Sequence, residues 1–157
     1  MNISGIVYDS VVDGEGLRNT LFVSGCRHDC KNCHNPQTWD FNYGYEFTKD
    51  LQSEFIKKCK DNPMLDGITI SGGDPIYSSK ELIFFLQKYK KVNPNHTIWL
   101  YTGFKYEDIK NNEILKYLDV LVDGRYIDEL RDTTLAFRGS SNQRIIKLKG
   151  GNIIDSI

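Results

Sequence analysis

The sequence predicts an α/β fold in which a mostly parallel sheet forms an open, partial β/α barrel. Short β-branched segments alternate with stretches of helical periodicity along most of the 157 residues, and this alternation is typical of βαβ units. Loops rich in glycine and polar residues follow several of the predicted strands, as they do at the ligand-binding edge of parallel sheets. Because a closed barrel of eight βα units needs about 250 residues, the length favours a partial barrel in a single domain, residues 1–157.

Three segments have helical patterns. Residues 47–61 place apolar side chains on one face, and Thr48 is the expected N-cap. Residues 78–91 form a second predicted helix that begins at one of two serines and ends before a proline. The segment 105–118 is also helical, with an expected interruption at Asn111–Asn112.

The remaining apolar segments are short and rich in β-branched residues, which predicts strands at 18–25, 67–73, 96–103, 119–124 and 143–148. Residues 150–155 are expected to turn back as the arm of a hairpin. Right-handed crossovers place the carboxyl ends of parallel strands on one edge of the sheet. We therefore expect the loops "GCRHDCKNC", "SGGDP", "YTGF" and "VDGRY" to meet at that edge.

Composition excludes some classes of function. The chain is 39% hydrophobic and 26% charged, with a formal net charge of -1. This balance gives no electrostatic reason to expect binding to nucleic acid or to an anionic membrane. No apolar run approaches the roughly 20 residues of a membrane span, and the N-terminus does not resemble a signal peptide. We expect a cytoplasmic protein, in which cysteines stay reduced.

Three of the four cysteines lie within one short loop: Cys26, Cys30 and Cys33. One interpretation is a zinc site that His28 or His34 completes. A second is an electron-transfer cluster with Cys59 as the fourth ligand, although the spacing differs from that of common bacterial ferredoxins. A third is a 4Fe-4S cluster in which the three cysteines leave one iron open, as catalytic metal centres require.

Cys59 fits a structural role better than a ligand role. It shares the apolar face of the predicted helix 47–61 with Leu51 and Phe55. A free cysteine in such a position usually packs as a small hydrophobic residue.

Six motifs, in this order, resemble the radical S-adenosylmethionine (SAM) superfamily and, within it, the activating enzymes of the anaerobic (class III) ribonucleotide reductase: "DGEGLRNTLFVSGC" (13–26), "CRHDCKNCHNPQTW" (26–39), "SGGDP" (71–75), "WLYTGF" (99–104), "DVLVDGRY" (119–126) and "RGSSNQR" (138–144). The resemblance covers nearly the whole chain. It implies a radical-SAM-type partial barrel, with a 4Fe-4S cluster and SAM as cofactors.

The resemblance also implies the reaction and the partners. Cys26, Cys30 and Cys33 would ligate the cluster, and reductive cleavage of SAM would yield a 5′-deoxyadenosyl radical. That radical would generate a glycyl radical on the large subunit of the reductase. A protein substrate would cover the open side of so small a barrel, and a flavodoxin-like protein would donate the electron.

The resemblance further implies which residues bind SAM. Asn32, Cys33 and His34 would lie near the adenine, although Asn32 stands where many members carry an aromatic residue. The carbonyl groups of Gly72 and Gly73 and the carboxylate of Asp74 would accept hydrogen bonds from the SAM ammonium. Thr102, Asp123, Arg125 and Arg138 are further candidates at the same edge.

Several assignments stay open on the sequence alone. Asn142 and Arg144 have no defined role, and the loop 11–18 is expected to flank the entrance for a glycine-bearing peptide. Two other classes of protein remain possible: a radical SAM enzyme acting on a small molecule, and a non-catalytic iron–sulfur or zinc-binding module.

Overall fold

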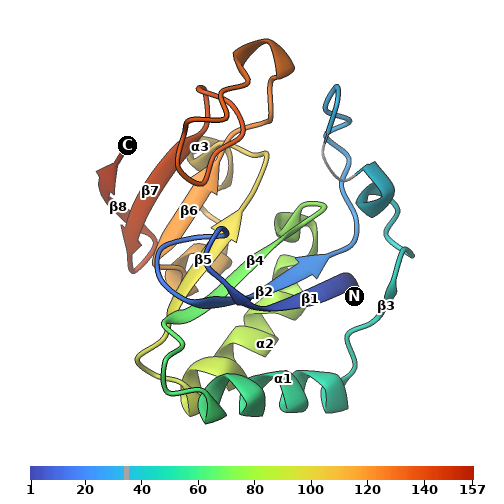
Figure 1. The fold of residues 1–157 in the computed structure, drawn as a ribbon, viewed down its shortest axis with the longest axis vertical. Coiled ribbons are helices and arrows are strands. Elements are labelled where there is room, and N and C mark those ends of the chain that lie inside the picture. The colour runs from blue at the N-terminus through green and yellow to red at the C-terminus, as the bar shows by residue number, and fades with distance from the viewer. Residues whose placement is uncertain (34–35) are drawn as a thin grey trace.

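A computed structural model describes residues 1–33 and 36–157. Over this range the strands form one 8-stranded sheet in the order β3-β1-β2-β4-β5-β6-β7-β8 (Figure 1). The strands are β1 Asn2–Ser10, β2 Arg18–Val23, β3 Tyr45–Glu46, β4 Gly67–Gly72, β5 Thr97–Tyr101, β6 Val120–Asp123, β7 Arg144–Lys149 and β8 Asn152–Ser156. The helices are α1 Lys49–Asp61, α2 Ser79–Val92 and α3 Tyr106–Ile109, with short 3-10 turns η1 Pro36–Trp39, η2 Pro75–Ser78, η3 Glu113–Tyr117 and η4 Asp128–Leu130.

The sheet is mixed, so the prediction of a mostly parallel sheet is wrong. Strands β2, β4, β5 and β6 pair in parallel, whereas β1, β3, β7 and β8 join the sheet through antiparallel pairs. Between β6 and β7 the chain forms only the short turn η4. Because a parallel return needs a long crossover, β7 runs back beside β6. The sheet is open, with β3 and β8 as its two edges.

The predicted helices are confirmed. The backbone N–H of Leu51 donates to Thr48 Oγ1 at 3.1 Å, so Thr48 caps α1 as expected. The segment 105–118 divides into α3 and η3, and the Asn112 side chain caps the second piece by accepting from the Ile114 N–H at 3.0 Å. The hairpin arm is β8, whereas the pattern analysis did not predict β1 and β3.

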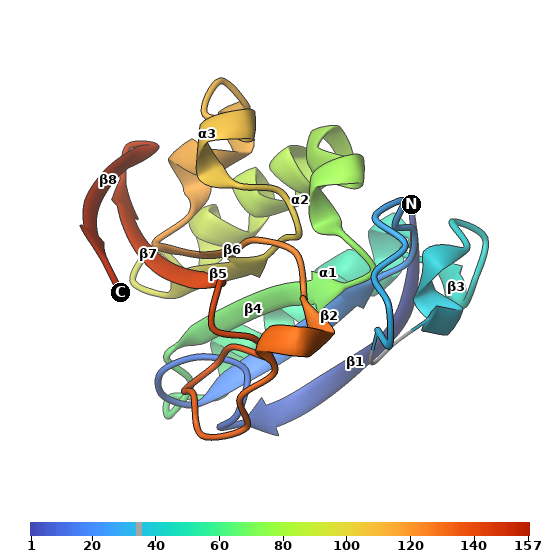
Figure 2. The same ribbon diagram turned by 90° about the horizontal axis from the view of Figure 1, so that it is seen from above.

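Alternation along the strands divides the molecule into two sides. Ile98 and Leu100 face the main core, which packs against α1 and α2. Trp99 and Val122 point to the opposite face, where they form a smaller cluster with Ile145. The helices lie on the first side, and the loops 11–17 and 131–143 lie over the second (Figure 2). The second side is therefore the more open one.

In the part of the chain that the structure describes, no helix combines the length and the apolarity that crossing a membrane requires.

Candidate functional site

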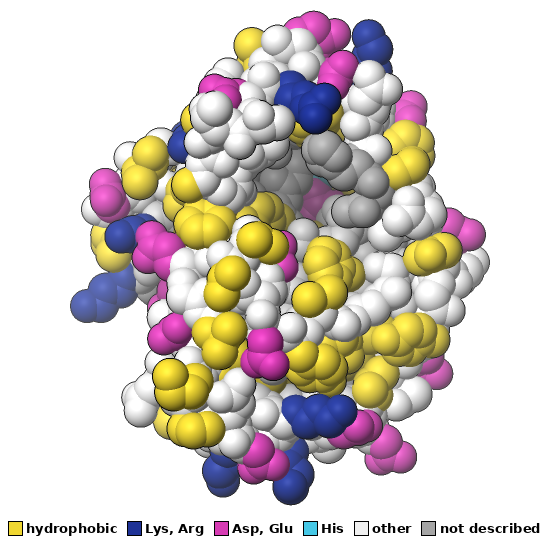
Figure 3. Space-filling model, in the orientation of Figure 1, with side chains coloured by type: hydrophobic (Ala, Val, Ile, Leu, Met, Phe, Trp, Pro, Cys, Tyr) yellow, Lys and Arg dark blue, Asp and Glu magenta, His cyan; other side chains and the backbone are white. Residues whose placement is uncertain are grey.

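A cavity of about 260 Å³ lies at the carboxyl ends of β4, β5 and β6. Its wall includes the three clustered cysteines together with residues of the other three predicted loops: Gly72, Gly73, Thr102, Gly103, Gly124 and Tyr126. The surface is hollowed here, between the cysteine loop and the 124–143 segment (Figure 3). The expectation that these loops meet at one edge of the sheet is confirmed.

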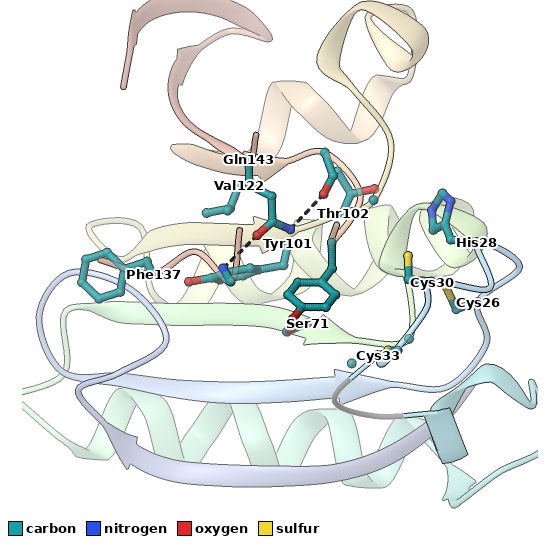
Figure 4. A pocket seen from close by; sticks show the side chains of 16 residues that line it. Cys26, His28, Cys30, Cys33, Ser71, Tyr101, Thr102, Val122, Phe137 and Gln143 are labelled. Atoms are coloured by element: carbon teal, nitrogen blue, oxygen red, sulfur yellow. Dashed lines mark hydrogen bonds between the residues drawn. The ribbon is translucent and has the colours of Figure 1, made fainter. Parts of the chain in front are cut away.

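The cysteine loop begins at the end of β2 and is anchored at its base. Gly25 N donates to Thr38 O at 2.7 Å, and Cys26 N donates to Trp39 O at 3.2 Å. All of the cysteines are free thiols. Cys26, Cys30 and Cys33 are partly buried and line the cavity together (Figure 4).

Burial favours the protonated form of two of these thiols. It raises the pKa of Cys26 to about 11. Burial, followed by the nearby Cys33, also raises the pKa of Cys30, and the charge of Arg125 opposes this rise. A bound cation reverses this preference, because a coordinating thiol is deprotonated. The site therefore suits a positively charged inorganic group better than it suits free thiolates.

A single zinc ion and a 4Fe-4S cluster place different demands on the three thiols. Ligands of one tetrahedral zinc lie about 4 Å from one another, and the described residues contain no set of three or more His, Cys, Asp or Glu side chains placed to hold one ion. His28 Nε2 lies 2.6 Å from Asp74 Oδ2, which leaves Nδ1 available as a metal ligand, and His34 lies outside the described residues. A cubane binds each thiolate to a different iron, so its thiolates stand farther apart.

Cys59 takes no part in the site. It is fully buried in the main core on α1 and accepts a hydrogen bond from Asn19 Nδ2 at 3.3 Å. The interpretation in which Cys59 is the fourth ligand of a ferredoxin-like cluster is therefore wrong, and its structural role is confirmed.

Gly72 and Gly73 bring the end of β4 very close to β2. Gly72 has a φ of 111°, and a Cβ built on it would lie 2.3 Å from Val23 O. A Cβ on Gly73 would lie 2.5 Å from Gly25 O. Only glycine fits these contacts. The two residues line the cavity as expected, and they also fix the base of the cysteine loop.

Asp74 is placed differently from Gly72 and Gly73. It is 1% exposed, and its carboxylate is bound by its own chain. His28 Nε2 lies 2.6 Å from Oδ2, Thr102 Oγ1 lies 2.9 Å from both oxygens, and Gly103 N donates to Oδ2 at 2.8 Å. Ile76 N donates to Oδ1 at 3.0 Å. The carboxylate thus supports the cavity wall from behind.

His28, which the sequence suggested only as a zinc ligand, lines the cavity. Its ring lies edge-on to Phe104, with the centroids 4.6 Å apart, and 5.7 Å from the centroid of Tyr77. Its Nδ1 is buried without a hydrogen-bond partner in the described structure. In the tautomer that donates Nε2–H to Asp74, Nδ1 is a bare acceptor. An unsatisfied acceptor on a cavity-lining residue fits a ligand that carries N–H or O–H donors.

Asn32 lies at the rim. It has a φ of 55°, which asparagine tolerates well, and its Nδ2 donates to Asp128 Oδ2 at 2.9 Å. The amide therefore joins the cysteine loop to η4, and a contact between Asn32 and adenine stays a prediction.

Asp123 pairs with Arg144 rather than with Arg125. The Asp123 carboxylate is 1% exposed and accepts from Arg144 Nη2 at 2.5 Å and from Tyr106 N at 2.7 Å. The hydrogen bond from Arg144 to Asp123 raises the pKa of Arg144 above its usual value. Arg125 is exposed, and Arg138 Nε donates to Ala136 O at 3.3 Å. The structure brings neither Asp123 nor these two arginines into the cavity wall.

The sequence pattern did not predict that Gln143, Tyr126 and Phe137 line the cavity. Gln143 accepts from Gly139 N at 2.8 Å and donates to Gly124 O at 2.9 Å (Figure 4). It thereby holds the loop before β7 against the end of β6. Tyr126 and Gln143 both lie within quoted motifs, whereas nothing in the sequence distinguishes Phe137 from a core residue.

The loop 11–18 does not line the cavity, and the expectation that it flanks the entrance for a peptide stays a prediction. Leu17 N donates to Asp66 Oδ2 at 2.8 Å, just before β4 begins. A Cβ on Gly14 would lie 2.9 Å from the Trp99 ring. The loop thus covers the amino-terminal half of the open face.

Comparisons with known proteins agree with this site. The family model described as a 4Fe-4S single cluster domain matches residues 12–146. The anaerobic ribonucleoside-triphosphate reductase-activating protein of Haemophilus influenzae is 41% identical over 144 residues, which are 88% of this chain and 93% of that protein. The protein of the same name from Enterobacteria phage T4 is 42% identical over 147 residues, 92% of this chain and 93% of its own. The Escherichia coli K12 protein of that name is 37% identical over 144 residues, 88% of this chain and 94% of its own.

Proposed function

Because the chain belongs to the 4Fe-4S single cluster domain family and to the anaerobic ribonucleoside-triphosphate reductase-activating proteins within it, we propose that it activates such a reductase as a radical SAM enzyme. One observation carries the proposal: three cysteines of one loop line the same cavity as the glycine and threonine loops of the adjacent parallel strands. A purely structural cluster would need the thiols but not this hollow.

Different residues of this chain would hold the cluster and orient the ligand. Cys26, Cys30 and Cys33 would each hold one iron and leave the fourth open. The chemistry that the bound cluster supplies is the reductive cleavage of SAM to methionine and a 5′-deoxyadenosyl radical. The carbonyl groups of Gly72 and Gly73 would orient the ligand, and the apolar wall of Tyr101, Val122 and Phe137 would limit the access of water. Thr102 joins them at the end of β5.

The protein substrate would be the large subunit of the reductase. A hydrogen atom would pass from a backbone glycine Cα to the 5′ carbon of the nucleotide, which leaves 5′-deoxyadenosine and a glycyl radical. The hollow on the open face supports a substrate that enters as a peptide loop. We place Asn32, His34, Arg125 and Arg138 around this entrance, with Asp123 holding the wall beside it.

Further proposals complete this assignment. A flavodoxin-like protein would supply the electron, and residues 1–157 would work as one domain with the curvature of a partial radical-SAM-type barrel. A cytoplasmic location suits the cysteines, all of which are free thiols.

The test is anaerobic reconstitution of the protein followed by assays of SAM cleavage and glycyl-radical formation. We expect the reduced protein to produce 5′-deoxyadenosine, and we expect a glycyl-radical electron paramagnetic resonance signal only when the large subunit is present. Replacing Cys26, Cys30 and Cys33 together by serine should abolish iron binding and both products. The matched control is Cys59→Ala, which removes the thiol that lies in the core and should retain both.

Two results would contradict the proposal. SAM cleavage that consumes a small molecule without any partner protein would indicate the small-molecule class of radical SAM enzyme. A protein that binds iron but never cleaves SAM would be a non-catalytic module.

A further inference from the structure

We propose that Asp74 does not contact the ammonium group of the nucleotide, and that it is instead a positioning residue that holds the cysteine loop against the ends of β4 and β5. This inference rests on the proposed function, since it assumes that SAM binds in the cavity. It reassigns the one acidic residue of the "SGGDP" loop, and it moves the recognition of the ammonium to neighbouring atoms.

The Asp74 carboxylate has no acceptor site left for a ligand. Two carboxylate oxygens offer about four acceptor sites, and four groups of this chain already occupy them: His28 Nε2, Thr102 Oγ1, Gly103 N and Ile76 N, at 2.6 to 3.0 Å. The residue is 1% exposed and is absent from the described cavity wall. An ammonium could reach it only by displacing one of these donors.

The four donors to the Asp74 carboxylate come from the ends of three different strands. His28 lies between two of the cluster cysteines on the loop after β2. Thr102 and Gly103 follow β5, and Ile76 belongs to η2 after β4. The carboxylate is therefore the point at which the three loops that would hold cluster and nucleotide are joined.

The packing around the Asp74 carboxylate leaves its neighbours little room to move. A Cβ on Gly103 would lie 2.7 Å from His28 Cδ2, so loop and ring are already in contact. Phe104 and Tyr77 pack against the same ring. A change in the carboxylate will therefore displace His28, and with it the segment between Cys26 and Cys30.

Recognition of the ammonium then falls to other acceptors. The residues of this loop that do line the cavity are Ser71, Gly72 and Gly73. Their carbonyl groups and the serine hydroxyl are neutral acceptors at the surface of the hollow. The charge of Asp74 would act on the ligand through the geometry it imposes and not through a direct hydrogen bond.

The test compares two ligands on the reconstituted, oxidised holoenzyme without reductant. SAM carries the ammonium, and 5′-methylthioadenosine lacks the whole amino-acid portion. If Asp74 positions the wall, Asp74→Asn will weaken the binding of 5′-methylthioadenosine as well as that of SAM, because the displaced wall contacts the nucleoside of both ligands. If Asp74 contacts the ammonium, the variant will lose about tenfold or more for SAM alone.

A further variant separates positioning from contact. Asp74→Glu keeps the charge but moves it by one methylene, so it should weaken both ligands as Asp74→Asn does, whereas a direct contact would retain SAM affinity. His28→Gln does not separate the two roles, because the ring itself lines the cavity. If the Asp74 variants fail to fold, ¹⁵N spectra of the wild type with and without SAM serve instead: the His28 signal should stay that of a donor to Asp74, whereas a contact between Asp74 and the ammonium would displace it. Asp155→Asn, on the exposed strand β8, is the matched control and should bind like the wild type.

The ¹⁵N signal of the His28 ring adds a measurement that a loss of stability alone would not change. In ¹⁵N spectra of the wild type the His28 ring should be the Nε2–H tautomer, and Asp74→Asn should alter that signal. Selective loss of SAM binding in Asp74→Asn, or unchanged binding of both ligands, would overturn the inference and leave the proposed function standing. Failure of the wild-type holoenzyme to bind SAM would instead overturn the proposed function.

Discussion

At the scale of the residue, the burial of Cys26 opposes the ionisation that metal binding requires of its thiol. Burial raises the pKa of its thiol from 9.0 to about 11 in the folded protein. Above pH 9 the unfolded chain has lost this proton while the folded chain still holds it. Stability of the cluster-free protein should therefore fall as the pH rises from about 9 to about 11, because the folded state then binds more protons.

The measurement is urea denaturation of the cluster-free protein at several pH values in that window. Cys26→Ser should show a shallower decline than the wild type, with a difference on the order of 1 kcal/mol once the partial exposure of the thiol is allowed for. The comparison between the two proteins cancels the titration of lysines and tyrosines. Identical pH profiles would show that the folded environment does not favour the protonated thiol.

The sequence predicted the cysteines through their spacing within one loop, and the resemblance implied Gly72 and Gly73. Thr102 was a candidate because it follows a predicted strand at the same edge. The sequence could not predict the partners of the buried acids. Asp123 pairs with Arg144 because the two residues face each other in the β6–β7 register. Nothing in the local pattern favours Arg144 over Arg125, since that choice depends on the direction of β7.

At the scale of the element, the contact between β2 and β4 determines where the site sits. Gly72 ends β4 beside Val23, the last residue of β2, and the cysteine loop starts at once beyond Val23. We predict that Gly72→Ala destabilises the protein by about 2–4 kcal/mol, because a Cβ at φ 111° would lie 2.3 Å from Val23 O. It should also reduce the iron content after reconstitution, since β2 must shift.

The matched control is Gly5→Ala. Gly5 lies in β1, and a Cβ there meets nothing within 4 Å, so this variant should be neutral or slightly more stable. Denaturation midpoints and the iron content of both variants measure the difference. Equal stability of Gly72→Ala and Gly5→Ala would contradict the close packing of β4 on β2.

The same scale explains which elements the sequence did not reveal. Strand β1 is interrupted by Gly5 and is exposed in its second half, so it lacks the apolar pattern of the buried strands. Strand β3 is only two residues long and exists through its pairing with Asn2 and Ile3. The direction of β7 follows from the missing crossover helix before it, and this signal should have weighed against a mostly parallel sheet.

At the scale of the whole molecule, the core and the site occupy different sides. The main core joins α1 and α2 to one face of the sheet through fully buried residues such as Phe55, Leu82 and Phe85. The cysteine loop lies beyond the strand ends and adds little to that core. A chain of this length buries enough surface to fold without a metal. The fold therefore supplies a platform, and the loops at its edge supply the chemistry.

This separation predicts that removal of the cluster leaves the fold intact. After oxidative loss of iron, the protein should keep its far-ultraviolet circular dichroism and unfold in one cooperative transition, unlike small zinc domains that unfold without metal. Hydrogen exchange should rise in the cysteine loop and in residues 71–75 and 101–104, which the cluster and Asp74 tie together, while α1 and α2 stay protected. Loss of protection throughout the helices would show that the cluster stabilises the core as well as the site.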